Sequence, residues 1–210
     1  LSIECMALLE KGKEIFEMKV TLKDGSVREY AQPMAVIDIA KDISEGLARN
    51  VCAATVNGEG VDIRTVIDKD STLVLHTFDD QEGKAAFWHT TSHILAQAVK
   101  RLFPETKLAI GPSIAEGFYY DFDRPDSFTA DDLTALEAEM KKIVKENLAL
   151  ERFTLPRDEA IKFMQEKEEP YKVELIEDLP EDAEISFYDQ GDFVDLCAGP
   201  HLMSTKGIKA

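Results

Sequence analysis

Two short motifs that hold three of the chain's four histidines most constrain its fold: His89-Thr-Thr-Ser-His93 and Cys197-Ala-Gly-Pro-His201. The first lies in an apolar-periodic run over 87–103 that predicts a helix, and residues four apart project from the same face of a helix. The second lies at a Gly-Pro turn, where the backbone bends sharply and side chains can converge. If both motifs serve one site, the fold must bring the helix face to the turn.

The side chains of these motifs suit two kinds of site. Three imidazoles and a thiol match the ligand set of a tetrahedral zinc site, so His89, His93, Cys197 and His201 are candidate zinc ligands. The same groups also suit a hydrolytic pocket of bases and hydrogen-bond donors, and the spacing alone does not choose between the two. The pattern is not that of a metalloprotease, because that motif needs Glu beside the first His and Thr90 stands there.

The length and composition indicate a globular protein of one large or two small domains, with 210 residues of which 44% are hydrophobic. No apolar run approaches the roughly 20 residues that span a bilayer, and the first residues lack the features of a secretory signal. Three widely spaced cysteines do not form a disulfide framework. We therefore expect a cytoplasmic protein without membrane contact.

The net charge of −17, from 24 Lys and Arg against 41 Asp and Glu, opposes contact with polyanions. Nucleic-acid-binding domains usually carry a basic field, because phosphate contacts dominate their affinity. We therefore expect no DNA binding. Any contact with RNA should be confined to a small local site and should be weak in isolation.

The apolar patterns predict two units. The elements expected in the first are a hairpin at 18–30 around Asp24-Gly25, a helix at 34–48 and strands at 51–56 and 72–78. A polar stretch at 79–83 that ends in glycine predicts a linker. We expect the two units to fold separately and to pack lightly on each other.

The second unit is expected to carry both His/Cys motifs. Its predicted elements are a helix at 84–103, strands at 107–110 and 117–123, a helix at 130–147, a strand at 150–155, helices at 156–167 and 170–177, and strands at 185–188 and 193–196. Thr129 is the expected N-cap of the helix at 130–147. The last two strands deliver Cys197 and His201.

The second unit resembles the editing domain shared by threonyl- and alanyl-tRNA synthetases, which carries HxxxH early and CxxxH late. The segments that favour bacterial threonyl-tRNA synthetases are Lys107-Leu-Ala-Ile-Gly-Pro112, Gly117-Phe-Tyr-Tyr-Asp121, Tyr171-Lys-Val173 and Val194-Asp-Leu-Cys-Ala-Gly-Pro-His201. The first unit resembles the small ubiquitin-like TGS domain that precedes the editing domain in those enzymes. Together the two resemblances cover about 18–210.

The resemblance implies an α+β protein in which a small ubiquitin-like β-grasp domain at 18–78 and a linker at 79–83 precede a larger α+β editing domain at 84–210. Residues 1–17 form an N-terminal extension to which we assign no function. The family's enzymes continue with a catalytic domain that uses ATP, magnesium and zinc, and then with an anticodon-binding domain. We therefore expect an amino-terminal fragment that does not aminoacylate by itself.

The activity implied by the resemblance is hydrolysis of the ester bond of mischarged seryl-tRNA(Thr), with the acceptor end of that tRNA as partner. Serine lacks one methyl group of threonine, and such a difference gives only about 1–3 kcal/mol of discrimination, so a second, hydrolytic site is needed. Alanyl-type editing domains are associated with zinc, whereas the threonyl type is described as metal-independent. The resemblance thus favours a site without a metal, although the spacing alone fits zinc.

The resemblance also assigns roles to individual residues. His89 and Lys172 would be catalytic, His89 by activating a water and Lys172 by sharing that task or stabilising charge. The substrate-binding residues would be His93, Gly111, Tyr120, Asp195, Cys197 and His201. Cys197 is expected to shape the pocket rather than to attack the substrate.

Two other functions remain open from the sequence. One is a non-catalytic binding module in which the His/Cys motifs hold a structural zinc ion, and the other is a stand-alone trans-editing deacylase. Lys172 and Asp195 discriminate the binding module from a hydrolase, because a structural zinc site needs only its four ligands whereas a hydrolytic site needs a charged pair beside them.

Overall fold

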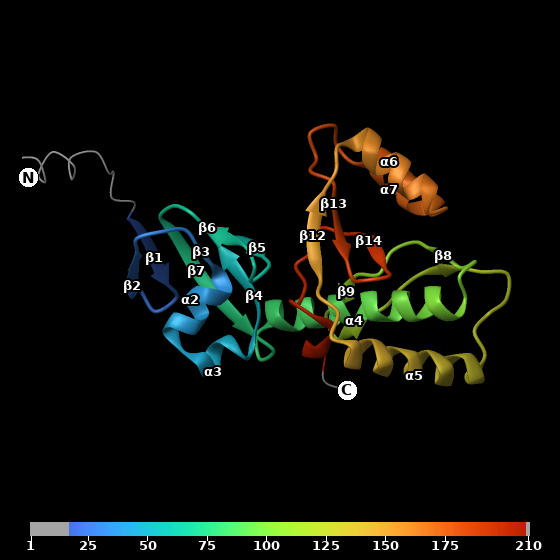
Figure 1. The fold of residues 1–210 in the computed structure, drawn as a ribbon, viewed down its shortest axis with the longest axis horizontal. Helices are drawn as coiled ribbons and strands as arrows, with labels where there is room; N and C mark the ends of the chain where they lie inside the picture. Colours follow the sequence, from blue (N-terminus) through green and yellow to red (C-terminus); the bar gives the residue numbers. More distant parts are fainter. Residues whose placement is uncertain (1–16, 209–210) are drawn as a thin grey trace, which may run out of the picture.

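The computed structural model describes residues 17–208, which form two α+β units (Figure 1). The predicted fold class is confirmed. The long helix α4 (Gln81–Leu102) begins at the first unit and runs into the second, where most of it is packed. Within the described residues, no helix is long and apolar enough to cross a membrane.

The first unit is a mixed sheet with one main helix across it. Its elements are β1 (Met18–Leu22), β2 (Val27–Tyr30), β3 (Met34–Ala35), α2 (Val36–Ile43), α3 (Glu45–Ala48), β4 (Val51–Val56), β5 (Glu59–Val61), β6 (Val66–Ile67) and β7 (Ser71–Thr77). The strand order is β2-β1-β7-β4-β5, with β1 and β7 parallel. Buried Val20, Ile39 and Leu73 join helix and sheet in one apolar core, so the predicted hairpin at 18–30 and strand at 51–56 are confirmed.

The helix predicted at 34–48 is divided into two. Residues 34–35 pair with β6, and α2 ends at Ile43 because Ser44 has an extended backbone and its hydroxyl accepts hydrogen bonds from the amides of Gly46 and Leu47. This is an N-cap arrangement, and it starts α3 as a new helix. The short strands β5 and β6 were not predicted, since two or three residues hold too little alternation to be recognised.

The second unit combines two long helices, a helical hairpin and several short strands. After α4 its elements are β8 (Lys107–Leu108), β9 (Ser113–Ile114), β10 (Gly117–Phe118), β11 (Phe122–Asp123), α5 (Ala130–Glu146), β12 (Glu151–Thr154), α6 (Arg157–Glu166), α7 (Pro170–Asp178), β13 (Ser186–Asp189), β14 (Val194–Leu196) and the 3-10 turn η1 (Thr205–Gly207). The antiparallel sheet β12-β13-β14 stands over α4, and the hairpin of α6 and α7 lies at the far end of that sheet (Figure 1).

Helices α4 and α5 pack side by side and form the main core of the second unit. Ile94 and Val99 of α4 meet Leu136 and Ile143 of α5, and all four are buried. The predicted cap of α5 is confirmed, because the Thr129 hydroxyl accepts a hydrogen bond from the amide of the third helical residue and the carboxylate of that residue accepts one in return. This core holds α4 rigidly, and α4 carries the first His motif.

The prediction of a linker at 79–83 is wrong for its last three residues. Helix α4 begins at Gln81, so residues 81–83 are helical. The polar character of this stretch has another cause, since the Asp80 carboxylate accepts hydrogen bonds from the Thr77 amide and hydroxyl and thereby fixes the turn between β7 and α4. Apolar packing also crosses the boundary, because Cys52 of β4 shares a core cluster with Ile94 and Leu202.

Candidate active site

The structure brings the two His/Cys motifs together. His89 and His93 project from one face of α4, and Cys197 and His201 lie on the turn that follows β14, so that one ligand atom from each of the four residues lies within 4.8 Å of every other. The Cys197 Sγ is 3.2 Å from the Nε2 of both His89 and His201. The predicted convergence is confirmed.

A turn with a close backbone approach presents the second motif. Gly199 has φ +80°, a left-handed conformation that favours glycine. A Cβ at this position would lie 2.1 Å from the Tyr188 hydroxyl oxygen, so the Tyr188 side chain occupies the space against the turn. The Gly199 amide also donates a hydrogen bond to the Cys197 sulfur at 3.3 Å. The turn therefore depends on Gly199 and on the tyrosine packed against it.

Thr90 sets the tautomer of His201. The Thr90 hydroxyl donates its one proton to the Ala86 carbonyl at 2.8 Å and accepts a hydrogen bond from the Leu202 amide at 2.9 Å. It must then also act as the acceptor for the Nδ1 of His201 at 3.2 Å. This leaves the Nε2 of His201 unprotonated and facing the thiol. The sequence pattern at Thr90 excluded a metalloprotease but did not predict the contact with His201. The signal that could have indicated it is a threonine within the His motif of a predicted helix.

The cluster is uncharged near neutral pH. Burial lowers the pKa of His93 to about 3 and lowers the pKa values of His89 and His201 as well. Burial also raises the pKa of the Cys197 thiol to about 12. Three neutral imidazoles and a protonated thiol thus form a set of weak acids and bases, in which an unprotonated ring nitrogen can accept a proton.

A buried charged pair lies directly beside this cluster. The Lys172 Nζ is 2.7 Å from the Asp195 Oδ1, and the other carboxylate oxygen of Asp195 accepts a hydrogen bond of 2.6 Å from the Tyr120 hydroxyl. That same oxygen is 3.7 Å from the Nε2 of His93, which links the pair to the cluster. Lys172 also donates to the Tyr120 hydroxyl at 3.1 Å.

The contacts around Asp195 keep its carboxylate ionised and keep the Tyr120 hydroxyl protonated. Burial is the largest single effect and would raise the pKa of Asp195, but the Lys172 charge, His93 and the hydrogen bonds from Lys172 and Tyr120 together hold that pKa below its ordinary value. Burial and the Asp195 charge raise the pKa of Tyr120 well above its usual range, so its hydroxyl stays a donor. The charged pair that distinguishes a hydrolytic site from a bare set of four ligands is therefore present.

Gly111 lies against Tyr120 and leaves no open space on its Cβ side. A Cβ at Gly111 would lie 2.0 Å from the Tyr120 ring, and the Gly111 carbonyl accepts a hydrogen bond of 2.7 Å from the Ser92 hydroxyl. The expectation that substrate approaches Gly111 closely on this side is therefore corrected. The Tyr120 ring fills the space where a Cβ of residue 111 would stand. Gly111 instead allows Tyr120 to reach Asp195.

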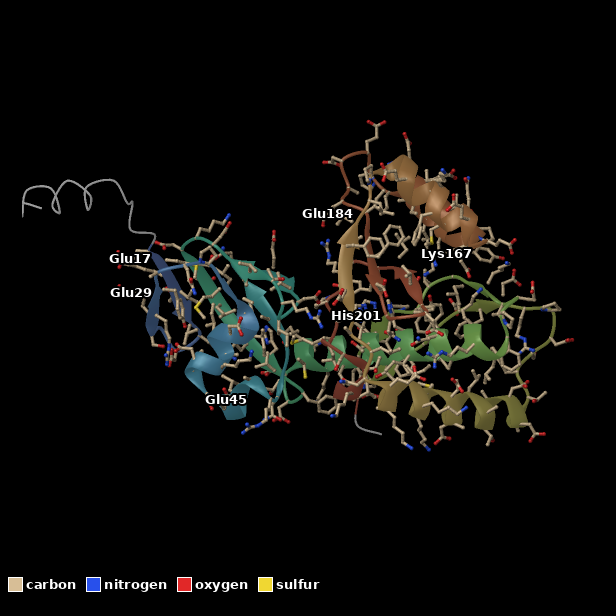
Figure 2. The ribbon with its side chains drawn as sticks, viewed as in Figure 1. Glu17, Glu29, Glu45, Lys167, Glu184 and His201 are labelled. Atoms are coloured by element: carbon tan, nitrogen blue, oxygen red, sulfur yellow. The ribbon has the colours of Figure 1, made fainter. Side chains whose placement is uncertain are left out.

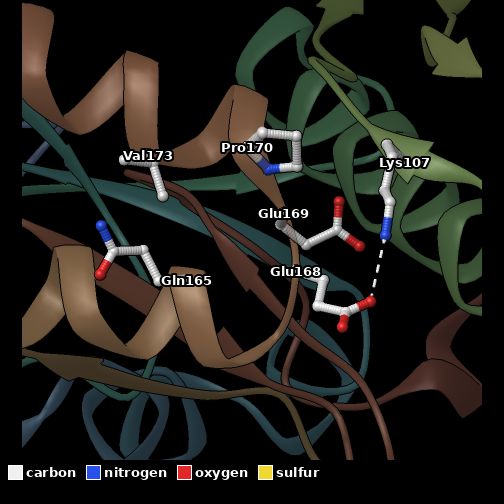
Figure 3. A pocket seen from close by; sticks show the side chains of 6 residues that line it. All are labelled: Lys107, Gln165, Glu168, Glu169, Pro170 and Val173. Atoms are coloured by element: carbon white, nitrogen blue, oxygen red, sulfur yellow. Dashed lines mark ion pairs between the residues drawn. The ribbon is translucent and has the colours of Figure 1, made fainter.

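Glu169 anchors the start of α7, the helix that carries Lys172. Its buried carboxylate accepts hydrogen bonds from the Lys100 ammonium at 2.7 Å and from the Leu108 amide at 2.8 Å. Figure 3 shows this carboxylate beside a hollow of about 480 Å³ where Lys107 and Glu168 form an ion pair of 3.5 Å. No residue of the His/Cys cluster lines that hollow, so we do not assign the chemistry to it.

The site opens toward a second, apolar hollow. Cys197 lines this hollow of about 220 Å³ together with Leu175 of α7, Leu179 just after that helix and Ala198 of the turn. Both leucines are partly exposed. The hollow therefore joins the thiol side of the cluster to the surface.

The donor set fits a zinc ion. Two ring nitrogens face the thiol, the remote nitrogen of His201 is held by Thr90 as metal-bound histidines usually are, and the buried Nδ1 of His93 has no hydrogen-bond partner in the part of the chain that the structure describes. Zinc binding would require loss of the thiol proton, because thiolate is the ligand form.

Comparison with known proteins finds two family models and several relatives that match this chain. Residues 18–77 match the family model for the TGS domain, and residues 185–210 match the model for the threonyl and alanyl tRNA synthetase second additional domain. The chain is 63% identical over 193 residues to the threonine–tRNA ligase of Acetivibrio thermocellus and 64% identical over 193 residues to that of Clostridium botulinum strain Alaska E43, covering 92% of this chain and 30% of each relative.

A third relative gives the same result. The threonine–tRNA ligase of Caldanaerobacter subterraneus subsp. tengcongensis is 58% identical over 199 residues, which is 95% of this chain and 31% of the relative. The chain thus spans under a third of the length of these relatives. It corresponds to the amino-terminal region of threonine–tRNA ligases and carries their TGS domain and their editing, or second additional, domain.

Proposed function

We propose that the His/Cys cluster and its charged pair hydrolyse the ester bond of seryl-tRNA(Thr). The observation that carries the proposal is the contact of 2.7 Å between the Lys172 Nζ and the Asp195 carboxylate beside the neutral cluster. Burying an ion pair costs desolvation energy, and a structural zinc site gains nothing from one. A hydrolytic site does gain, because a fixed positive charge stabilises the oxyanion that develops in the transition state.

His89 is the residue that we assign as general base. It is less buried than His93 and His201, and its lowered pKa keeps the ring unprotonated at neutral pH. A water that takes the place of the Cys197 thiol at the His89 Nε2, now 3.2 Å away, can attack the ester carbonyl and pass a proton to the ring. The imidazolium then returns the proton to the leaving ribose oxygen.

Lys172 is assigned to stabilise the oxyanion. An ammonium has three donors, and two of them point at Asp195 and at the Tyr120 hydroxyl. The third remains for the substrate. Asp195 and Tyr120 therefore fix the direction of the ammonium, and Asp195 keeps lone pairs that can accept a hydrogen bond from the seryl amine.

The other cluster residues are assigned to hold the seryl group. His93, Cys197 and His201 line the pocket beside the charged pair. The pKa of about 12 leaves the Cys197 thiol protonated, and a protonated thiol is a poor nucleophile. The proposed reaction therefore needs no covalent intermediate.

Zinc bound by His89, His93, Cys197 and His201 is the basis of a second candidate function, a non-catalytic binding module, and the donor set supports it. In that module the bound ion would act as a structural cross-link. Metal analysis and a deacylation assay of the purified protein distinguish the two functions. Stoichiometric zinc with no deacylation favours the binding module, whereas deacylation that persists in the presence of a chelator favours the editing site.

The wider functional assignment follows the relatives. The proteins matched are threonine–tRNA ligases, so we propose that this chain is part of such a ligase, in which ATP, magnesium and a further zinc ion serve other domains. The partner is the acceptor end of tRNA(Thr), and the compartment is the cytoplasm, where tRNA is charged. The charge of −17 predicts weak, salt-sensitive binding of tRNA by this chain alone.

Deacylation of seryl-tRNA(Thr) and threonyl-tRNA(Thr) by this chain tests the proposal. We expect the seryl ester to be hydrolysed well above the uncatalysed rate and the threonyl ester to be spared. Lys172→Met should abolish the difference, and Lys145→Met, which changes an exposed lysine on α5, should not. Equal hydrolysis of both esters, or of neither, would overturn the assignment.

A further inference from the structure

Asp62 connects the TGS domain to the turn that carries Cys197 and His201. It follows β5, and its two carboxylate oxygens accept separate hydrogen bonds, one from the His201 amide and one from the Tyr188 hydroxyl, each at 2.7 Å. Figure 2 places His201 where the two units meet. A single side chain of the first unit thus holds two parts of the candidate active site.

The two residues that Asp62 holds also pack on each other. The Tyr188 and His201 rings meet edge to face with centroids 4.4 Å apart, and both residues are buried. The Tyr188 hydroxyl occupies the space that a Cβ of Gly199 would need. Movement of Tyr188 would therefore shift the turn and the His201 ring together.

A second contact joins the same two segments. Arg64, two residues after Asp62, donates a hydrogen bond of 2.7 Å from Nη2 to the Met203 carbonyl, two residues after His201. Burial and the nearby Asp62 charge raise the pKa of Tyr188, so its hydroxyl remains a donor to the carboxylate. The segments 62–64 and 199–203 are thus fixed to each other at both ends.

We propose that Asp62 is a positioning residue through which the TGS domain sets the orientation of His201 in the editing site. Asp62 touches neither the thiol nor the charged pair, and it acts through the His201 backbone and the Tyr188 ring. The consequence for catalysis rests on the proposed esterase function. The consequence for the His201 ring does not, since it follows from the hydrogen bonds alone.

The amide variant Asp62→Asn tests this with little change of shape. An amide keeps one acceptor oxygen but replaces the other with an NH₂ group, which cannot accept from the Tyr188 hydroxyl or the His201 amide. The matched control is Asp70→Asn, because the Asp70 carboxylate accepts a backbone hydrogen bond from Lys19 within the same domain. The control makes the same chemical change at an exposed carboxylate that has no connection to the turn.

Two readouts separate positioning from a general loss of structure. The first is the ¹⁵N spectrum of the His201 ring, assigned with His201→Gln, which reports its tautomer and hydrogen bonds. The second is single-turnover deacylation of seryl-tRNA(Thr), in which displacement of a pocket group is expected to lower the rate constant by roughly tenfold to a hundredfold. Thermal unfolding of both variants measures stability in parallel.

We expect Asp62→Asn to shift the His201 ring signals and to lower the rate constant, with Asp70→Asn matching the parent in both. Tyr188→Phe should move the His201 signals in the same direction, and the double variant should add little. Parent-like His201 signals in Asp62→Asn would overturn the positioning role, whatever the rates. If the parent does not deacylate at all, the esterase proposal fails, while the ring signals still decide the role of Asp62.

Discussion

The Lys172 Nζ and the Asp195 Oδ1 form an ion pair of 2.7 Å in which both side chains are only 3% exposed. Removing one partner of such a pair leaves an uncompensated buried charge and costs about 3–5 kcal/mol. Replacing both partners with apolar residues removes that penalty.

The first prediction separates the stability of this pair from its chemistry. Lys172→Met should lower the free energy of unfolding by about 3–5 kcal/mol, and Lys172→Met with Asp195→Leu should recover most of that loss. Neither variant should hydrolyse seryl-tRNA(Thr). Urea denaturation and deacylation measure the two properties, and a double variant that regains activity along with stability would exclude a chemical role for the pair.

The pH dependence of deacylation reports on His89. Burial lowers the pKa of this residue, so the base stays unprotonated below the ordinary histidine pKa of about 6.5. We predict that the catalysed rate constant, corrected for spontaneous hydrolysis, is level through that pH and falls only in more acidic solution. Half-maximal activity at or above about pH 6.5 would contradict the assignment of this buried base.

Gly111 provides a steric test of the Tyr120 contact. In Gly111→Ala the new Cβ would lie 2.0 Å from the Tyr120 ring, so the ring must move and its hydrogen bond to Asp195 must break. We predict a loss of about 1–3 kcal/mol in the free energy of unfolding, together with reduced deacylation. Gly60→Ala is the control, since a Cβ there meets nothing within 4 Å. Equal behaviour of the two variants would show that Tyr120 can be displaced without cost.

Acid stability reports on His93. Its pKa is about 3 in the folded protein and about 6.5 in an unfolded chain, so between these values only the unfolded chain binds the proton. The contribution to stability is therefore complete above about pH 6.5 and is lost as the pH falls, at about 1.4 kcal/mol per pH unit. His93→Gln should reduce the slope by that amount in denaturation measured across this range, and an unchanged slope would contradict the shift.

The sequence predicted the features that depend on local pattern. The cap at Thr129, the hairpin at 18–30 and the projection of His89 and His93 from one helix face all follow from residue type and spacing. The start of α4 was misplaced because the polar residues of the turn at Asp80 resemble a linker, although they bond to the backbone.

Features that depend on distant packing could not be predicted in this way. The burial of Lys172 has no local signal, and only resemblance to a family singled it out from the other lysines. The link from Asp62 to Tyr188 and His201 joins residues from different domains, and no motif around residue 62 indicates it. Such contacts depend on how the first unit docks, which the α4 turn and the packing of Cys52 determine.

Single-turnover deacylation of seryl-tRNA(Thr) by the parent, His89→Ala and Cys197→Ser tests the central claim most directly. We predict that His89→Ala loses nearly all catalysed hydrolysis, because it removes the proposed general base, whereas Cys197→Ser keeps measurable activity and no acyl group is trapped on the parent protein. A seryl thioester trapped on Cys197, with complete loss of activity in Cys197→Ser, would contradict the account and identify the thiol as the nucleophile.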